Sequence, residues 1–240
     1  MGTKTVMAKE KRTLKTIDFR KYPLPRIRHH TNPNFYLPKS RLKVDLSFYP
    51  PVLETVDWSE HFANAQPPNV LDVGCGLGKF LLEYALNFPE DNILGVEVRP
   101  FVVQWLQNII ATEGIGNAAV FWYSVANGLG FLESESIDKL FYLFPDPWFK
   151  KRHFKRRAFT PDFVRECARV LKPTGRMYIM TDVPQVDEYH REILDATQLL
   201  EYRYVDETEW DVPIVTNQEE ICRNNQIPYV RMICTKRASS

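Results

Sequence analysis

The segment at residues 141–157, FYLFPDPWFKKRHFKRR, holds the residue types and spacing that best suggest chemistry. Its apolar, strand-like first part ends abruptly at Pro145-Asp146-Pro147-Trp148, and six Lys and Arg with one His then fall within the eight residues 150–157. A carboxylate and an aromatic ring at a strand end suit a flat, polar substrate, and the cations suit phosphates attached to it. The segment therefore indicates chemistry on a base of a nucleic acid.

A glycine-rich loop, V-L-D-V-G-C-G-L-G-K, occupies residues 70–79 and lets the backbone pass close against a ligand. A dinucleotide fingerprint would need its third glycine at position 79, where Lys79 stands, so a nicotinamide or flavin site is disfavoured. Glu97 ends the next predicted strand, where a carboxylate can accept hydrogen bonds from the hydroxyls of a ribose. Asp72, inside the first strand, suits a cationic ligand rather than a pyrophosphate.

The elements that must position these residues alternate along the chain. Strands are predicted at 70–73, 93–98, 118–123, 139–144, 176–181, 202–205 and 229–235, and helices at 79–87, 100–113, 161–171 and 184–199. This alternation predicts an α/β fold with a doubly wound, mostly parallel sheet. Ligands of such sheets lie beyond the carboxyl ends of the strands, so the loops after the first five strands are expected to form one site.

Charge is distributed unevenly along the 240 residues, although the net charge is only +1. Residues 1–43 carry twelve Lys and Arg against two acidic residues, whereas the remaining chain carries nineteen against twenty-eight. Two basic segments on an otherwise acidic protein indicate a localised polyanion footprint. We therefore expect a basic N-terminal arm at residues 1–45 and a catalytic domain at 46–240, with a solvated tail as the alternative for residues 1–20.

The remaining composition argues against several classes of protein. No apolar run approaches the roughly 20 residues that span a membrane, and the basic N-terminus lacks the apolar centre of a secretory signal. The four cysteines form no C-x-x-C pair and have no His at zinc-ligand spacing, so buried free thiols are expected rather than a metal site. We expect a cytoplasmic protein with neither membrane nor metal.

The glycine loop, Glu97 and Ala126-Asn127-Gly128 after the third strand together resemble the S-adenosylmethionine (SAM)-dependent methyltransferases. The resemblance implies a Rossmann-like methyltransferase sheet with a last antiparallel strand, and SAM as the cofactor. It implies cofactor contacts from Asp72, Gly74, Gly76, Glu97, Arg99, Asn127, Gly128 and Leu143. For Asn127, which the resemblance places at the adenine edge, a simple turn residue is the alternative.

The longer string FPDPW-x-KKRH-x-KRR resembles the tRNA (guanine-N7)-methyltransferase family, which makes 7-methylguanosine in the variable loop of tRNA. Three other segments match: Arg26-x-Arg28-x-His30-x-Asn32-Pro33, Thr181-Asp182, and Thr216-Asn217-Gln218-Glu219-Glu220. Asp72 and Asn127 depart from the usual bacterial residues but keep their hydrogen-bonding capacity. The resemblance implies tRNA as the partner and a monomer or homodimer, with a β-propeller partner subunit if the chain is eukaryotic.

The resemblance also assigns roles on the substrate side. Asp146 is expected to be catalytic through position and charge, because N7 of guanine has a free lone pair and the methylated ring becomes cationic. Substrate contacts are expected from Lys150, Lys151, Arg152, Arg156, Asp182, Thr216 and Glu219, with Lys155 and Arg157 completing the cations for RNA phosphates. Trp148 is either a stacking platform for the base or a core aromatic. Asp182 is either a helix cap or a substrate contact, and Thr216-x-x-Glu219 also fits a helix capping box.

Two other functions remain as alternatives. An amino-methyltransferase acting on adenine N6 or on a protein glutamine would have Asn-Pro-Pro-Tyr or a close relative at positions 146–149, which Asp146-Pro147-Trp148-Phe149 matches poorly. A non-catalytic RNA-binding subunit with a decayed fold would have a broken glycine loop or a missing acid. Gly74, Gly76, Glu97 and Asp146 are all present, so an active enzyme is favoured.

Overall fold

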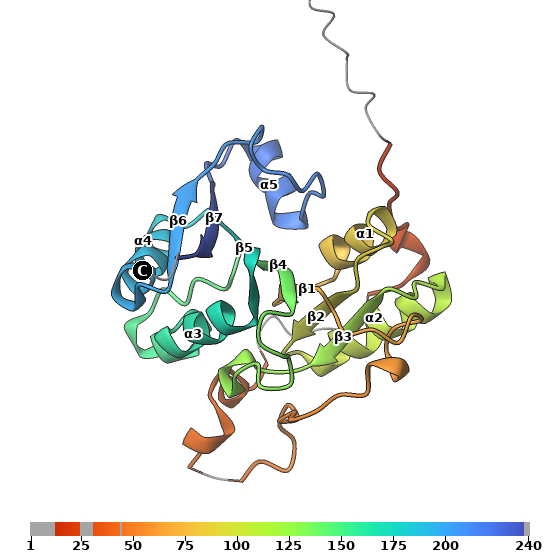
Figure 1. The fold of residues 1–240 in the computed structure, drawn as a ribbon, viewed down its shortest axis with the longest axis horizontal. Coiled ribbons are helices and arrows are strands. Elements are labelled where there is room, and N and C mark those ends of the chain that lie inside the picture. Colours follow the sequence, from red (N-terminus) through yellow and green to blue (C-terminus); the bar gives the residue numbers. More distant parts are fainter. Residues whose placement is uncertain (1–12, 25–30, 44, 238–240) are drawn as a thin grey trace, which may run out of the picture.

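The computed structural model describes residues 13–24, 31–43 and 45–237, in which seven strands form one sheet (Figure 1). The strands are β1 (Val70–Val73), β2 (Ile93–Glu97), β3 (Ala118–Trp122), β4 (Ile137–Leu143), β5 (Leu171–Thr181), β6 (Leu200–Tyr204) and β7 (Val230–Lys236). Their order is β3-β2-β1-β4-β5-β7-β6. The first five strands pair in parallel, and β7 pairs antiparallel with both β5 and β6. The predicted doubly wound, mostly parallel sheet with a last antiparallel strand is confirmed.

The long helices cover both faces of the sheet. They are α1 (Lys79–Asn87), α2 (Pro100–Glu113), α3 (Pro161–Val170), α4 (Pro184–Thr197) and α5 (Asn217–Asn225). Buried side chains of α1 and α2 join one hydrophobic cluster, and those of α3 and α4 join a second cluster on the other face. The sheet is therefore apolar on both sides, as its run of buried strand residues requires.

Local sequence explains where these helices begin and end. Pro100, Pro161 and Pro184 each occupy the first turn, where the missing N–H has no partner to lose. The side chain of Thr160 accepts a hydrogen bond from the backbone N–H of Phe163 and caps α3. These signals explain why the predicted helices on both faces lie close to the observed ones.

Strand β5 begins at Leu171 rather than at Arg176, where the Pro173-Thr174-Gly175 turn led us to expect its start. Leu171 already pairs with Ile137, and the ladder continues with an irregular register into Arg176. Gly175 makes this possible, because a Cβ there would lie 2.8 Å from the carbonyl oxygen of Ile137. The absence of a side chain thus lets the chain bend without leaving the sheet.

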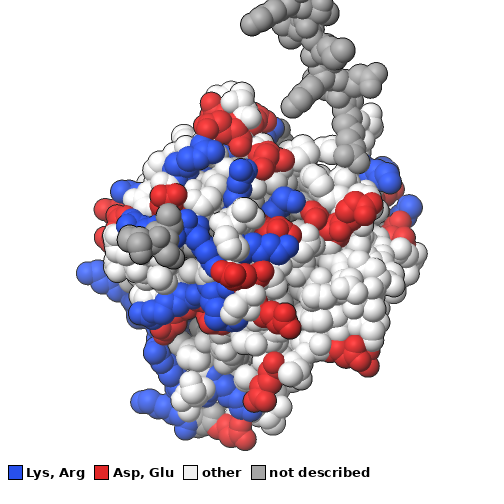
Figure 2. Space-filling model, in the orientation of Figure 1, with Lys and Arg blue, Asp and Glu red and all other residues white. Residues whose placement is uncertain are grey.

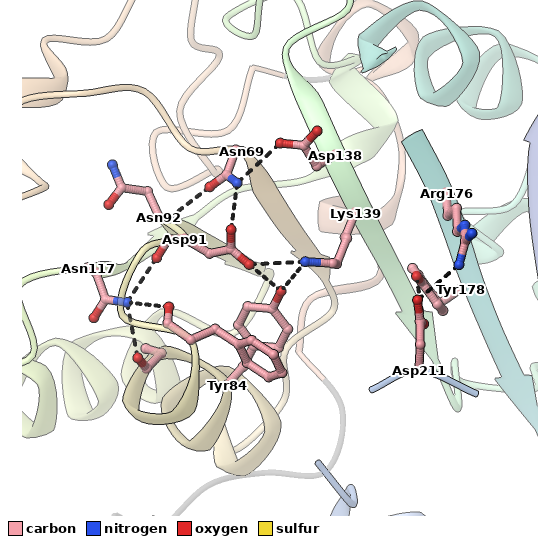
Figure 3. A network of polar contacts seen from close by, with 12 residues as sticks. Asn69, Tyr84, Asp91, Asn92, Asn117, Asp138, Lys139, Arg176, Tyr178 and Asp211 are labelled. Carbon is pink, nitrogen blue, oxygen red and sulfur yellow. Dashed lines mark hydrogen bonds and ion pairs between the residues drawn. The ribbon is translucent and has the colours of Figure 1, made fainter. Parts of the chain in front are cut away.

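Asparagine and aspartate side chains connect the strands at their amino ends, as Figure 3 shows. The Asn69 amide donates to the carboxylates of Asp91, at 2.8 Å, and of Asp138. Asp91 also accepts from the Tyr84 hydroxyl, at 2.6 Å, and from the Lys139 ammonium, at 3.1 Å. Burial opposes ionisation of Asp91, but these hydrogen bonds lower its pKa overall. The polar side chains at the amino ends of these strands thus bond to one another, so their role is to hold the strands together.

The four cysteines are buried and free of disulfides, in agreement with the sequence-based expectation. Among the helices in the described parts of the chain, none is both long and apolar enough to cross a membrane.

Candidate active site

Two adjoining cavities, of about 240 and 170 Å³, lie at the carboxyl edge of the sheet. The larger one is lined by the ends of β2 and β4, by the loop after β3 and by the N-terminal segment. The smaller one lies between the glycine loop and the start of α5. Both are lined by Gly74, Gly76, Leu143 and Phe144, so together they form one continuous candidate site.

The glycine loop has a backbone that only glycine adopts readily. Gly74, Gly76 and Gly78 have φ angles of +75°, +57° and +72°. A Cβ at Gly74 would meet nothing within 4 Å, because this position faces the cavities. At Gly78 a Cβ would lie 2.4 Å from a methyl carbon of Leu106. The first glycine therefore leaves room for a ligand, and the third lets α2 pack closely.

Asp72 is buried directly behind this loop. Asp72 is 3% exposed, and its Oδ2 atom has no hydrogen-bond partner. Burial, together with the nearby Glu97 carboxylate, raises the pKa of Asp72 to about 7. An unpartnered buried carboxylate oxygen costs free energy unless a ligand satisfies it. The smaller cavity, which Asp72 lines, is thus suited to a positively charged group.

Glu97 joins the glycine loop to the start of α2. Its Oε2 accepts from the Gly76 backbone N–H at 3.1 Å and from the Arg99 guanidinium at 3.0 Å. Its Oε1 accepts from the backbone N–H and Nε of Arg99, each at 3.0 Å. These four bonds occupy the usual acceptor positions of a carboxylate. A ribose can bind Glu97 only if the Arg99 side chain gives up part of this contact.

The loop after β4 presents Asp146 at the rim of the larger cavity, where it is exposed. Phe144 and Trp148 on either side of Pro145-Asp146-Pro147 have φ angles of +50° and +42°. Such angles are uncommon for bulky residues, and strained backbone of this kind concentrates at functional sites. The two prolines restrict the backbone on either side of Asp146.

Trp148 is only 9% exposed and its ring is covered on several sides. The Tyr36 ring meets it edge-on, with centroids 5.1 Å apart, and the Arg156 guanidinium carbon lies 4.9 Å from its centroid. Trp148 therefore supports the wall of the cavity. Of the two interpretations made from sequence, the packed aromatic agrees better with this environment than an open stacking platform.

The basic cluster, residues 150–157, divides into two groups. A short 3₁₀ helix, η6 (Lys151–Arg156), and the residue before it carry the cations that are exposed to solvent, namely Lys150, Lys151, Arg152 and Lys155. Arg157 instead is 9% exposed, donates to the Pro147 carbonyl oxygen at 3.1 Å and lies over the Phe154 and Tyr189 rings. Arg156 lines the larger cavity.

The exposed cations are accompanied by an aromatic ring. Phe149 is 66% exposed, immediately before them. Figure 2 shows Lys and Arg side chains concentrated on the left and lower parts of the face drawn, with few on the right. An uneven surface of this kind, with an exposed ring beside its cations, suits a single-stranded or looped nucleic acid.

The Asn127 side chain forms hydrogen bonds with the N-terminal segment and does not line the cavity. Its Oδ1 accepts from the Lys39 backbone N–H at 2.8 Å, and its amide also bonds to the Tyr49 hydroxyl. Gly128 lies against the Glu166 side chain. Ser124, Val125 and Ala126 line the larger cavity beside them, so cofactor contact by Asn127 and Gly128 stays a prediction.

The start of α5 closes the smaller cavity. The Thr216 hydroxyl accepts from the Glu219 backbone N–H at 3.0 Å, which confirms that half of the predicted capping box. The Glu219 carboxylate is 2% exposed and accepts from Arg223 and Arg231, both at 2.7 Å. Its direct contact with substrate stays a prediction, because in the structure it anchors α5.

Asp182, at the end of β5, also contacts α5. Its carboxylate accepts from the Gln218 side-chain amide at 2.8 Å. The N-cap of α4 is Val183, without a side-chain cap, so Asp182 does not serve as the helix cap that sequence offered as an alternative. Lys79 forms a 2.5 Å ion pair with Glu220 across the same gap between α1 and α5.

Tyr36 is one of several cavity-lining residues that sequence reasoning did not name, and it is the one that comes from the N-terminal segment. It belongs to a short 3₁₀ helix, η2 (Pro33–Tyr36), in the predicted N-terminal arm. The only sequence signal is its position just after the Asn32-Pro33 part of the N-terminal motif. Arg26, Arg28 and His30 of that motif lie outside the described residues. No set of three or more His, Cys, Asp or Glu within the described residues is placed to hold a metal ion.

Solved structures share the fold of this chain. A 16S rRNA methyltransferase, KamB, superimposes with a TM-score of 0.52 at 16% identity, covering 75% of this chain and 90% of that one. The aminoglycoside resistance methyltransferase NpmB1 superimposes with a TM-score of 0.52 at 16% identity, covering 71% of this chain and 87% of that one. These likenesses show a Rossmann-like fold, in which the cavities lie at the carboxyl edge of the sheet.

Sequence relatives give the family. Residues 66–232 match a family model described as putative methyltransferase. A tRNA (guanine-N(7)-)-methyltransferase of Thermosynechococcus vestitus is 38% identical over 68% of this chain and 72% of its own length. The enzyme of the same name from Synechococcus elongatus is 33% identical over 74% of this chain and 85% of its own length. The one from Dictyostelium discoideum is 30% identical over 82% of this chain and 73% of its own length. The chain belongs to the tRNA (guanine-N7)-methyltransferase family.

Proposed function

We propose that the protein transfers a methyl group from SAM to N7 of a guanine in tRNA, in the variable loop as the family resemblance implies. One observation carries the proposal beyond family membership. Asp146 lines the same cavity as Gly74 and Gly76 of the glycine loop, and the exposed cations of residues 150–155 begin four residues after it in the chain. This arrangement supports a site in which the glycine loop holds the cofactor, Asp146 faces the base and the nearby cations hold phosphates.

The residues around the smaller cavity fit SAM. The unpartnered Oδ2 of Asp72 provides negative charge for a cationic ligand, and the open space at Gly74 provides room. Glu97, which lines the adjoining larger cavity, would hold the ribose once the Arg99 side chain shifts, and Leu143, which lines both cavities, would contact the cofactor. When bound, SAM supplies an electrophilic methyl group on a sulfonium sulfur.

The chemistry required of the chain is positioning and electrostatic stabilisation. The lone pair of guanine N7 attacks the methyl carbon directly, so no proton has to leave N7. The purine ring gains positive charge as the carbon–sulfur bond breaks. The Asp146 carboxylate at the rim stabilises that charge. Exposed Lys150, Lys151 and Arg152 hold the phosphates without reading the sequence.

The test is methylation of tRNA by the purified protein, followed by borohydride–aniline cleavage, which cuts RNA only at 7-methylguanosine, and by mass mapping of the fragments. Cleavage at a single guanine of the variable loop is the expected result. A matched tRNA with 7-deazaguanosine at that position should accept no methyl group, because it lacks N7. Methylated tRNA that resists cleavage would reject the guanine-N7 assignment.

A cytoplasmic location, the oligomeric state and a possible β-propeller partner remain predictions from sequence.

A further inference from the structure

The N-terminal segment is fastened over the site by several independent contacts. The Asn32 side chain accepts from the Asn34 backbone N–H and starts η2. Phe35 is 2% exposed and packs edge-on against Trp122, with ring centroids 5.8 Å apart. The Tyr49 hydroxyl donates to the Leu37 carbonyl oxygen at 2.6 Å. Tyr36, which follows the buried Phe35, is thereby held in one place.

The side chain of Tyr36 lines the larger cavity, where Asp146 and Arg156 as well as Glu97 and Arg99 act on it. Its ring touches Trp148, and it lies close enough to Asp146 to respond to that charge. Burial, followed by the carboxylates of Asp146 and Glu97, raises the pKa of Tyr36 well above its ordinary value. The phenol therefore keeps its proton at any physiological pH and remains a hydrogen-bond donor.

A base that reacts at N7 must be held by the atoms beside N7. On that edge guanine offers two acceptors, N7 and O6, whereas adenine offers N7 and an amino group. N7 is used by the reaction, so O6 is the atom through which the edge can be fixed. An ionised Asp146 has no proton to give to O6, but the Tyr36 hydroxyl has one.

We propose that the Tyr36 hydroxyl donates a hydrogen bond to O6 of the target guanine and so positions N7 toward the cofactor. This inference rests on the proposed function. It makes Tyr36, from the N-terminal segment, a positioning residue that also favours guanine over adenine.

The test combines Tyr36→Phe with a change in the RNA. Single-turnover methylation is measured on tRNA carrying guanine or 2-aminopurine, which lacks O6, at the target position. We expect Tyr36→Phe to slow methylation of the guanine substrate about tenfold, the effect of one hydrogen bond, and to leave the 2-aminopurine rate unchanged. Equal slowing of both substrates, or no slowing of either, would overturn the proposal.

Three controls separate positioning from structure. Tyr49→Phe loosens the segment without touching the cavity, so it should affect both substrates equally. Tyr36→Leu also removes the ring contact with Trp148 and should slow both. Tyr202→Phe, on the far edge strand β6, should change neither. Cofactor affinity measured by calorimetry should not move in Tyr36→Phe, and a weakened affinity would assign the hydroxyl to the cofactor instead. Aniline cleavage of wild-type product tests the guanine-N7 activity separately.

Discussion

The guanidinium of Arg156 lies over the ring of Trp148, 4.9 Å from its centroid, at the wall of the cavity that contains Asp146. This contact turns one cation of the basic cluster away from the outer surface and toward the reacting groups. Its neighbour Lys155 is exposed on the same short helix. The cluster, one run of cations in the sequence, is therefore divided in the structure between the cavity wall and the outer surface.

Replacing Arg156 should affect the reaction more than the binding of tRNA. Arg156→Ala removes the cation over Trp148, and we expect a fall in kcat of at least tenfold with little change in the salt dependence of tRNA affinity. Arg156→Lys keeps the charge but loses the planar stack, so it should restore activity only in part. Lys155→Ala is the matched control and should leave kcat near that of the wild type. A normal kcat in Arg156→Ala would contradict this assignment.

The exposed cations should account for the salt dependence. The triple change of Lys150, Lys151 and Arg152 to Ala should reduce the slope of log K against log[salt] by roughly one unit per lost phosphate contact. The control is a second triple change to Ala, at Arg203 of β6, Lys236 of β7 and Arg237 just after β7. It changes the net charge by the same amount. Fluorescence anisotropy over a series of salt concentrations provides the slopes. Identical slopes in both triples would show that residues 150–152 do not touch RNA.

Asp146→Asn tests the electrostatic role of the carboxylate. The change keeps size and hydrogen bonding but deletes the charge, so folding and cofactor binding should survive. We expect single-turnover methyl transfer to slow by about 10²–10³-fold, the usual cost of losing one transition-state electrostatic contact. A fully active variant would leave the family assignment intact and reject the charge role.

Glu97→Gln should weaken cofactor binding. The substitution removes the negative charge that accepts from Gly76 and Arg99 and that we expect to bind the ribose. Loss of one charged hydrogen bond corresponds to about 1.5–3 kcal/mol, or at least tenfold in Kd by calorimetry. Glu90→Gln, at an exposed position before β2, is the control. Equal affinities in the two variants would exclude Glu97 as a cofactor ligand.

Asp72 should make stability depend on pH in the absence of cofactor. Its pKa is about 7 in the folded protein against an ordinary 3.8, so the folded state holds the extra proton between these values. The contribution of Asp72 to the free energy of unfolding is therefore highest below pH 4 and falls as the pH rises toward 7, because the folded state must then bury a charge. Asp72→Asn cannot ionise, so its free energy of unfolding should not fall in this way. The difference in free energy of unfolding between the variant and the wild type, measured in urea, should grow by about a few kcal/mol between pH 4.5 and 8.

Two comparisons complete that test. Asp45→Asn, an exposed control, should show no such trend. Cofactor affinity should fall in Asp72→Asn, because the amide cannot ionise to balance a positively charged ligand. A pH-independent difference between Asp72→Asn and the wild type would contradict the buried, protonated carboxyl.

The sequence by itself determined the parts of the protein that depend on local pattern. Hydrophobic periodicity and helix-initiating prolines placed the strands and helices on both faces of the sheet. The glycine loop and the Asp-Pro-Trp segment predicted the two ends of the site, because parallel strands bring their carboxyl ends to one edge. Among the α-helices in the described residues, α5 was not predicted, although the capping box that begins at Thr216 was recognised.

The tertiary structure decided which side chains meet and in which direction they point. The sequence presents residues 150–157 as one run of cations, but packing buries Arg157 and turns Arg156 onto Trp148. Tyr36 lies more than a hundred residues before Asp146 in the chain, so no local pattern could place the two in one cavity. Asn127 satisfies the backbone of the N-terminal segment instead of facing the cavity. These relationships depend on contacts between distant segments, which close packing and hydrogen bonding fix only when the whole chain has folded.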